Sequence, residues 1–547
     1  MHIRYNQAGY FPHQTKSIII QSDVDIALQR WCIATSQNQI VCEGVLNQSI
    51  QGITEYTPKS YNYTIDFSHI QTCGTYVFSI DSHEISILIS ESPYSAYAHD
   101  VLYGIRARRS ASNNSLIHGY SHGGDAACDI FMRVNNSNSE WNKRDDGKQA
   151  NMLGGWYDAG DYMKFTHTIA YTTYFLLLAY EHNPLLFSNV FSNSHTDLND
   201  LLDEAKYGLD FLMKTLPEKD IFIIQVGGHL DHTQGERLPE HDTLDGAREC
   251  YAALSKPQMG LTVAALALGA RIFATTSYSH EAQNYKEKAL EIFYAAIESN
   301  EPPAWNETDK EVFYADSTSN DNMELAAIEL FKCTQNVRFL QEATQNVNNQ
   351  EQVLWASWAH VGLHAHALLI PFYKEIIPKV ESNLRFFKQI GDAENNIWHT
   401  PHESTWGTLY SYFSVANAAF LFKQATGSSE FHEIQYHVLD FLFGVNPWGI
   451  AFIASEKLAH SISSTYAIMY RIQPHIFPRG EIAEGPTTKE IHNANNSVFN
   501  PPHNAQLWHA EFNTNTFTFF EQPGDYICME TTITGLADGL FLLATAH

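Results

Sequence analysis

Apolar and polar residues follow one another in short runs over the first part of the chain, and such runs predict strands. Three runs are rich in β-branched residues and partly alternating, at 17–21, 75–80 and 84–89. Gly, Asn, Ser and Pro separate them, as turns between strands require. Residues 1–92 are therefore expected to form a small all-β sandwich domain.

From about residue 98 the apolar residues recur with a helical period instead. Patterns of helix length follow one another to the end of the chain, at 171–180, 259–275, 282–297, 325–334, 353–370, 415–426, 434–443 and 530–546. Successive helices joined by long loops are typical of a helical barrel whose loops build a groove at one end. Residues 98–547 are therefore predicted to form a second, all-α domain. Residues 110–155 are rich in Ser, Asn and Gly and are predicted to be loop.

The charge balance limits the class of partner. The 547 residues include 33 basic and 61 acidic side chains, a net charge of −28. This charge argues against nucleic acid or an anionic membrane surface as a partner, and it suits a neutral or cationic substrate such as a polysaccharide. The oligomeric state is left open.

The apolar residues also bear on location. No run of about 18 apolar residues is present, so we expect no membrane span. The first residues lack the apolar core of a signal peptide. As written, the chain is expected to be cytoplasmic; it would be extracellular if a leader had been removed.

The cysteines are scattered along the chain. There are seven of them, without paired spacing, and this pattern predicts mostly free thiols. A pair between Cys32 and either Cys42 or Cys73 stays open.

One stretch carries the strongest chemical signal. Asp158 and Asp161 flank Ala159–Gly160, a small pair that lets the backbone turn tightly and both carboxylates point into one space. A water held between two close carboxylates is a plausible nucleophile, with one Asp acting as base. The alternative is an Asx-turn that caps the following helix. We favour chemistry because aromatic residues on both sides suit the apolar face of a sugar ring: Trp156, Tyr157 and Tyr162.

The block Gly155–Tyr162 resembles the signature of glycoside hydrolase family 9, the inverting cellulase family. The resemblance implies an N-terminal immunoglobulin-like domain (1–92) followed by an (α/α)6 barrel (98–547). It further implies that Asp161 is the general base and that Asp158 helps to hold the water.

A second block near the C-terminus would supply the general acid. Gly524–Asp525–Tyr526 followed by Glu530 resembles the family's second signature, in which this Glu is the proton donor. Apolar neighbours would raise its pKa, as a general acid requires. Without the first block, Glu530 reads equally well as a carboxylate at a helix N-terminus.

Other blocks match the family in part. The segment 440–449 resembles a helix end of the family, and the loops 226–232 and 237–242 with Tyr314 resemble parts of its groove. Arg479 fits a sugar-gripping arginine, whereas Pro478 and Met529 replace the family's His and Asn. The resemblance assigns further residues to substrate binding: Trp156, Tyr157, Trp406, His475, Arg479 and Tyr526. For His475, the interpretation as a loop residue without a role is nearly as good as that of a sugar contact.

A metal site is considered at residues 118–129. His118, His122, Asp125, Cys128 and Asp129 lie close in sequence, and related enzymes hold a zinc nearby with two Cys and two His. Because only Cys128 is available here, we expect no zinc at this loop. No cofactor is expected to be required, and calcium at the barrel surface is compatible with the resemblance.

The sequence thus predicts an inverting β-glycosidase acting on a β-1,4-linked glucan such as cellulose or cellodextrins. One alternative is exo-action on short oligosaccharides, as a β-glucosidase or an exo-β-glucosaminidase. The other is a carbohydrate-binding protein that has lost turnover. Retention of Asp158, Asp161 and Glu530 together argues against that last alternative.

Overall fold

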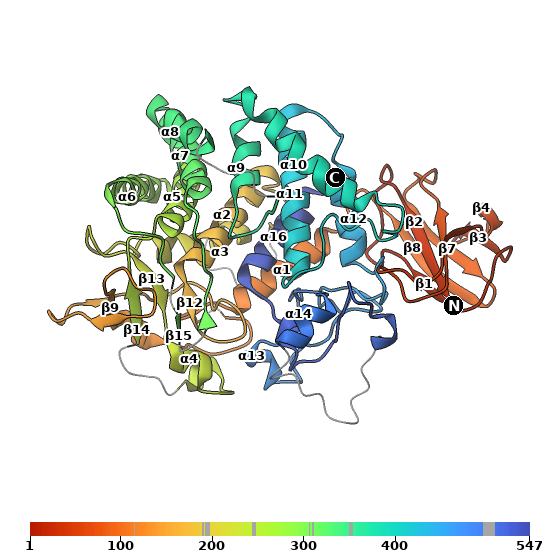
Figure 1. Cartoon of the computed structure of the whole chain (residues 1–547), viewed down its shortest axis with the longest axis horizontal. Coiled ribbons are helices and arrows are strands. Elements are labelled where there is room, and N and C mark those ends of the chain that lie inside the picture. The colour runs from red at the N-terminus through yellow and green to blue at the C-terminus, as the bar shows by residue number, and fades with distance from the viewer. Residues whose placement is uncertain are drawn as a thin grey trace.

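The computed structural model describes residues 1–113, 115–188, 191, 197–242, 248–305, 307–308, 311–348, 354–495 and 509–546. Strands fill the first part of the chain and helices dominate the rest, with the N-terminal domain beside the helical body (Figure 1).

The N-terminal domain is a sandwich of two four-stranded antiparallel sheets. One has the order β1 (His2–Arg4), β2 (Ser17–Ser22), β6 (Tyr61–Asp66), β5 (Gln48–Gln51). The other has the order β4 (Ile40–Val45), β3 (Arg30–Thr35), β7 (Gly74–Ile80), β8 (His83–Ile89). Alternate residues of β7 are buried, and they share one apolar core with residues of β2 and β6. The expected sandwich is confirmed.

The second domain is a closed ring of helices. The inner helices are α2 (Thr166–His182), α5 (Lys256–Phe273), α7 (Asn320–Thr334), α9 (Gly362–Leu369), α11 (Thr408–Thr426) and α16 (Ile533–Thr545). Each contacts the next in this order, and α16 returns to α2. Inner helices such as α2, α5 and α11 are buried along nearly their whole length, which requires a surrounding layer to cover them.

The surrounding layer is one outer helix against each inner one. The outer helices are α1 (Ser95–Ala107), α3 (Asp200–Leu212), α6 (Ser279–Glu298), α8 (Val337–Asn348), α10 (Ile377–Gly391) and α12 (Glu433–Leu442). This pairing is the predicted (α/α)6 arrangement.

Some helix predictions differ from the structure. The helix expected over 353–370 is confined to α9; residue 353 lies outside the described part, and 354–361 form turns and an isolated bridge. The helix expected over 530–546 begins only at Ile533, where the Thr532 side chain caps it. Glu530 therefore does not belong to a helix N-terminus.

The expected loop region 110–155 contains strands of a third sheet. Its main path is β10 (Trp141–Lys143), β9 (Cys128–Arg133), β14 (Glu249–Ala252), β13 (Ile223–Val226), β12 (Lys164–Phe165), with β11 (Gln149–Ala150) also paired to β9. A small hairpin joins β15 (Glu307–Thr308) and β16 (Glu311–Val312). The central pairing joins β9 to β14, for example Asp129 to Glu249, so local composition did not reveal this sheet.

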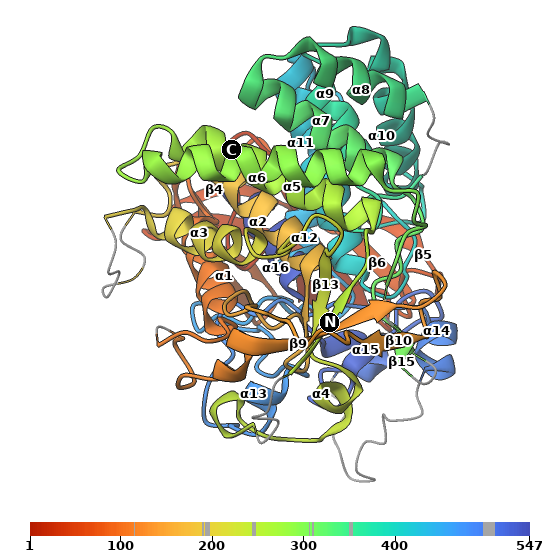
Figure 2. The same cartoon turned by 90° about the vertical axis from the view of Figure 1, so that its left-hand side faces the viewer.

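Short helices gather at one end of the barrel. They are α4 (His229–Thr233), α13 (Ile468–Arg471), α14 (Lys489–Ala494) and α15 (Tyr526–Met529). Both views place α4 and α13 at the same end, below the long helices (Figures 1 and 2). This end carries the candidate site.

One segment, Tyr526–Thr545, is long and apolar enough to cross a membrane by length and composition, although we expected none. Of its most apolar window, 94% is buried inside the protein. The segment is therefore accounted for as a core element of the barrel.

The two domains meet at a polar seam. Asn6 Nδ2 donates to Asp440 Oδ1 at 2.8 Å, and the Gln7 amide donates to the carbonyl of Phe443 at 3.0 Å. Arg4 Nη1 donates to the carbonyl of Trp448 at 2.9 Å. The segment 440–449 thus serves to dock the N-terminal domain.

Candidate active site

The Asp158–Asp161 block is a tight loop that leads into β12 and α2. The Asp158 amide donates to the carbonyl of Met163 at 3.0 Å, and the Met163 amide donates to Asp161 Oδ1 at 2.9 Å. Gly155 precedes the loop at φ +72°, and a Cβ there would lie 2.9 Å from Ile169 Cδ1. The glycine is therefore needed both for the left-handed turn and for close packing.

Asp158 is the buried member of the pair, with 1% of its surface exposed. Its two carboxylate oxygens accept hydrogen bonds from the hydroxyls of Thr168, on α2, and Tyr314. Burial raises the pKa of Asp158 to about 6, and these two donors oppose the shift. The carboxyl group is thus fixed in orientation from two sides.

Asp161 is the more accessible member, with 15% of its side chain exposed. Its Oδ2 lies 2.7 Å from Nδ1 of His232, on α4. When Asp161 is ionised, His232 holds it as a donor from Nδ1, and the carboxylate keeps a face toward solvent. This arrangement suits a base that receives a proton from water.

Glu530 comes to this block from the far end of the sequence. It lies in extended backbone between α15 and α16, where the Ile533 amide donates to the carbonyl of Asp158 at 2.9 Å. The Gly160 amide donates to Glu530 Oε1 at 3.0 Å across 370 positions. Burial first, and the nearby Asp161 second, raise the pKa of Glu530 to about 7.

Gly160 makes this approach possible. A Cβ at residue 160 would lie 2.7 Å from Glu530 Oε1 and 2.8 Å from Cδ1 of Tyr466. Any side chain would therefore displace the glutamate or the tyrosine. The Ala159–Gly160 pair thus turns the chain and also leaves room for the carboxyl group of Glu530.

The loop is supported from behind by a buried ion pair. Arg108 Nη2 and Glu481 Oε2 lie 2.6 Å apart, both fully buried, and Arg108 Nη1 donates to the carbonyl of Ala159 at 2.5 Å. Charge-assisted bonds of this kind fix backbone position strongly.

The structure separates the six expected sugar contacts into three groups. Trp156 and Tyr157 are fully buried and cannot stack on a sugar: Trp156 Nε1 donates to Glu204 at 2.6 Å, and the Tyr157 hydroxyl lies 2.6 Å from Ser121 Oγ. The reading of these two as a binding surface is corrected by their burial, which makes them supports of the loop.

Exposed Trp406 and half-buried Tyr526 form an aromatic pair. Trp406 is 39% exposed, and its ring centroid lies 5.6 Å from that of Tyr526, which in turn lies 5.8 Å from Tyr466. Because Tyr466 is next to Gly160 and Glu530, the three rings make an aromatic wall beside the carboxylates. This is the geometry that sugar stacking needs.

Arg479 contacts α1, and among the described residues no hydrogen bond or ion pair joins His475 to the proposed catalytic carboxylates. Arg479 Nε donates to Asp100 Oδ1 at 2.7 Å, and its guanidinium carbon lies 4.8 Å over the Tyr103 ring, so it faces α1. His475 is exposed in a turn. The structure does not bring either of them to the carboxylates.

Several residues of the site were not singled out by sequence. His232 and Tyr314 stood only within weakly matching segments, and Thr168 and Arg108 gave no signal. Their positions depend on contacts between distant parts of the chain, which spacing cannot reveal.

The polar groups at 118–129 are engaged with protein partners. His122 Nδ1 contacts the Tyr157 hydroxyl and its Nε2 lies 2.9 Å from Asp242. Asp125 is paired with Arg248 at 3.0 Å and Lys164 at 2.7 Å. The other members also have partners: His118 with the carbonyl of Gly119, Cys128 with that of Asp125, and Asp129 with Lys143.

His122, Asp231 and Asp242 lie close enough together to hold an ion. However, Arg248 lies 2.9 Å from Asp231, and Arg237 lies 3.0 Å from Asp242. Guanidinium groups already supply the positive charge, and both ring nitrogens of His122 are in use. A zinc ion does not fit this donor set.

Comparison with known proteins agrees with this geometry. Residues 1–84 match the cellulase N-terminal Ig-like domain, and residues 94–542 match glycosyl hydrolase family 9. The xyloglucan-specific endo-beta-1,4-glucanase BoGH9A of Bacteroides ovatus is 28% identical over 40% of this chain and 37% of its own length. Endoglucanase 4 of a Bacillus species is 29% identical over 51% of this chain and 45% of its own length. The chain thus spans less than half the length of either relative.

Solved structures share the whole fold. AaCel9A in complex with cellobiose-like isofagomine has a TM-score of 0.80 at 17% identity, over 100% of this chain and 99% of its own. A thermostable endoglucanase from Alicyclobacillus acidocaldarius has a TM-score of 0.78 at 17% identity, with the same coverage. These likenesses confirm an immunoglobulin-like domain followed by an (α/α)6 barrel. Together with the match over residues 94–542, they show that the chain belongs to glycosyl hydrolase family 9.

Proposed function

We propose that this protein is an inverting β-glycosidase that hydrolyses β-1,4-linked glucan, such as cellulose or cellodextrins. The observation that carries the proposal is the meeting of Glu530 with the Asp158–Asp161 block through the Gly160 amide. It joins a carboxyl group with a raised pKa to a partly exposed carboxylate, as acid and base require. The named relatives are endoglucanases, which supports the substrate class.

In this mechanism Asp161 is the general base. It takes a proton from a water, while His232 holds its Oδ2 and the Met163 amide holds its Oδ1. Asp158, fixed by Thr168 and Tyr314, orients the same water from the other side.

Glu530 is the general acid. The Gly160 amide donates to Oε1, so that oxygen is an acceptor and the acidic proton resides on Oε2. This proton passes to the glycosidic oxygen as the bond to the anomeric carbon breaks. The water attacks from the opposite face, which inverts the configuration and requires the two carboxyl groups to lie about 6.5–9.5 Å apart.

The stereochemistry of the first product tests the proposal. Proton NMR during hydrolysis of a cellodextrin should show the α-anomer first, because one displacement inverts the β-linkage. Early β-anomer would mean a retaining mechanism and would overturn this assignment. A panel of cellulose, cellodextrins, mixed-linkage glucan and chitosan oligomers identifies the preferred sugar.

Substitution of the base and the acid tests their roles separately. Asp161→Asn should lower kcat by about 10²–10⁴-fold, since general-base catalysis contributes that much. Glu530→Gln should lower it similarly on natural substrates, and less on an aryl glycoside whose leaving group needs no proton. Circular dichroism and the melting temperature serve as controls for folding. Near-normal turnover in folded Asp161→Asn protein would rule out its role as base.

A further inference from the structure

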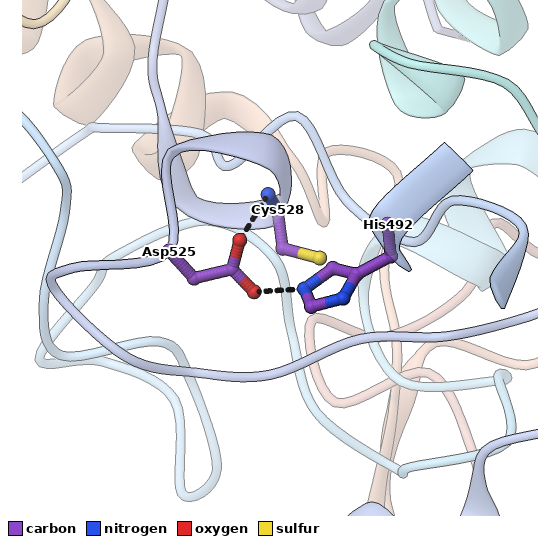
Figure 3. Close-up of side chains that lie close together, drawn as sticks. All are labelled: His492, Asp525 and Cys528. Atoms are coloured by element: carbon purple, nitrogen blue, oxygen red, sulfur yellow. Dashed lines mark hydrogen bonds and ion pairs between the residues drawn. The ribbon is translucent and has the colours of Figure 1, made fainter. Parts of the chain in front are cut away.

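Three side chains of different chemistry converge just before the proposed acid. His492 lies on α14, Cys528 lies on α15, and Asp525 precedes α15 (Figure 3). All three are buried, with 2%, 0% and 0% of their surface exposed respectively. One donor atom from each lies within 4.8 Å of the other two.

The Asp525 carboxylate lies at the centre of this arrangement. Asp525 Oδ1 caps α15 by accepting from the amides of Ile527 and Cys528, at 3.1 and 3.3 Å. Asp525 Oδ2 lies 2.9 Å from His492 Nε2. The Cys528 sulfur lies 3.7 Å from the carbonyl of Thr518 and also interacts with the Asp525 side chain. Capping of α15 requires neither the thiol nor the imidazole, yet both lie against this one carboxylate.

We propose that His492, Asp525 and Cys528 form a binding site for one zinc-type divalent ion. A thiolate, an imidazole and a carboxylate are the ligands that zinc takes, at about 2.0–2.3 Å. Three donors at those distances stand somewhat closer together than 4.8 Å, so a small contraction suffices. Calcium and magnesium favour all-oxygen sites and do not suit the sulfur. When the ion binds, the thiol proton leaves to solvent and Cys528 ligates as thiolate.

The donor set differs from the loop 118–129 in one decisive respect. There, Arg237 and Arg248 lie against the carboxylates and occupy the place of a cation. At His492–Asp525–Cys528, the imidazole lies 2.9 Å from the carboxylate, and the set contains a thiol, which the set His122–Asp231–Asp242 lacks.

An entry path and a structural consequence follow from the position. His492 and Thr518 line a cavity of about 700 Å³ between the N-terminal domain and the barrel, which also contacts Glu55. The ion would link α14 to α15, and α15 ends at Met529, next to Glu530. It would therefore stiffen the segment that carries the acid.

Cobalt substitution tests the site without reference to hydrolysis. The full chain is freed of metal with a chelator and titrated with Co²⁺ under reducing conditions. We expect one equivalent to produce a thiolate-to-cobalt charge-transfer band and intense visible bands of a tetrahedral ion, and Zn²⁺ to remove both. Absence of the charge-transfer band in the folded protein would overturn the proposal.

Variants locate the ion. Cys528→Ser and His492→Asn should each weaken Co²⁺ binding at least tenfold, and Zn²⁺ should raise the melting temperature only where the site is intact. Cys250→Ser, which alters another buried cysteine on β14, is the matched control and should keep the band. If Cys528→Ser does not fold, His492→Asn decides the question. An unchanged band in either folded site variant would place the ion elsewhere and refute the site.

Discussion

At the scale of single residues, the site depends on how unequally three carboxyl groups are surrounded. Asp158 is enclosed and doubly hydrogen-bonded, whereas Asp161 reaches solvent and is held by His232. Glu530 receives a single amide and lies near both negative charges. These differences support the proposed division of groups of the same chemistry into a water holder, a base and an acid.

The raised pKa of Glu530 predicts the alkaline limb of activity. Since the acid must be protonated and its pKa is about 7, kcat/KM should fall about tenfold per pH unit above that value. A pH–rate profile on a soluble cellodextrin measures it, with protein integrity checked at each pH. A limb near the ordinary glutamate pKa, about 4.3, would show that burial and Asp161 do not act on Glu530 as described.

The sequence revealed the three carboxyl groups but not what holds them. Asp158, Asp161 and Glu530 stand in recognisable local patterns, whereas Thr168, Tyr314 and His232 reach them through contacts that span the fold. Trp156 and Tyr157, by contrast, were recognised in the sequence, but their role was predicted wrongly. An aromatic ring beside a glycine-rich turn suits a sugar platform or a buried support, and only burial distinguishes the two.

At the scale of elements, the sequence likewise revealed the inner helices better than the outer ones. The inner helices α2, α5 and α11 are apolar on nearly every face, so their patterns were visible along the chain. The outer helices α1, α3, α8 and α10 were not predicted. An outer helix such as α8 buries a stripe that includes Phe339, Ala343 and Val347, within a largely polar sequence. Sequence spacing therefore identified the inner helices better than the outer helices that cover them.

The loop between the aspartates predicts the effect of adding one methyl group. Gly160→Ala should lower kcat by at least tenfold, because its Cβ would lie 2.7 Å from Glu530 Oε1 and 2.8 Å from the Tyr466 ring. Overpacking of this kind typically costs about 1–3 kcal/mol, so the protein should remain folded. Gly524→Ala is the control, since a Cβ there meets nothing within 4 Å. Equal activity in the two variants would contradict the close fit at Gly160.

At the scale of the whole molecule, the seam between the domains contains a buried acid. Asp440 is 6% exposed, and it accepts from Asn6 and Gln14 of the N-terminal domain at 2.8 and 3.4 Å. Burial raises its pKa to about 7 despite these donors. Docking of the two domains is therefore linked to protonation of this group.

This linkage has a defined sign. The folded pKa of Asp440 lies above the unfolded value of about 3.9. Its contribution is therefore complete below about pH 4 and is lost as pH rises through about 7. Asp440→Asn should reduce the fall in melting temperature between those pH values, measured by calorimetry against wild type. Glu433→Gln, an exposed change at the same seam where Glu433 accepts from Thr15, should leave the fall unchanged. Parallel curves for wild type and Asp440→Asn would exclude the linkage.

The closing of the ring by α16 has a consequence for synthesis on the ribosome. Inner helices α2 and α11 both pack against α16, yet α16 is translated after the other helices that the structure describes. Until it emerges, the nascent barrel exposes the apolar faces that α16 later covers, while the N-terminal sandwich has all its strands. The same late segment brings Glu530. Completion of the core and completion of the proposed catalytic set would thus be one event, and a partly made barrel would lack the proposed acid.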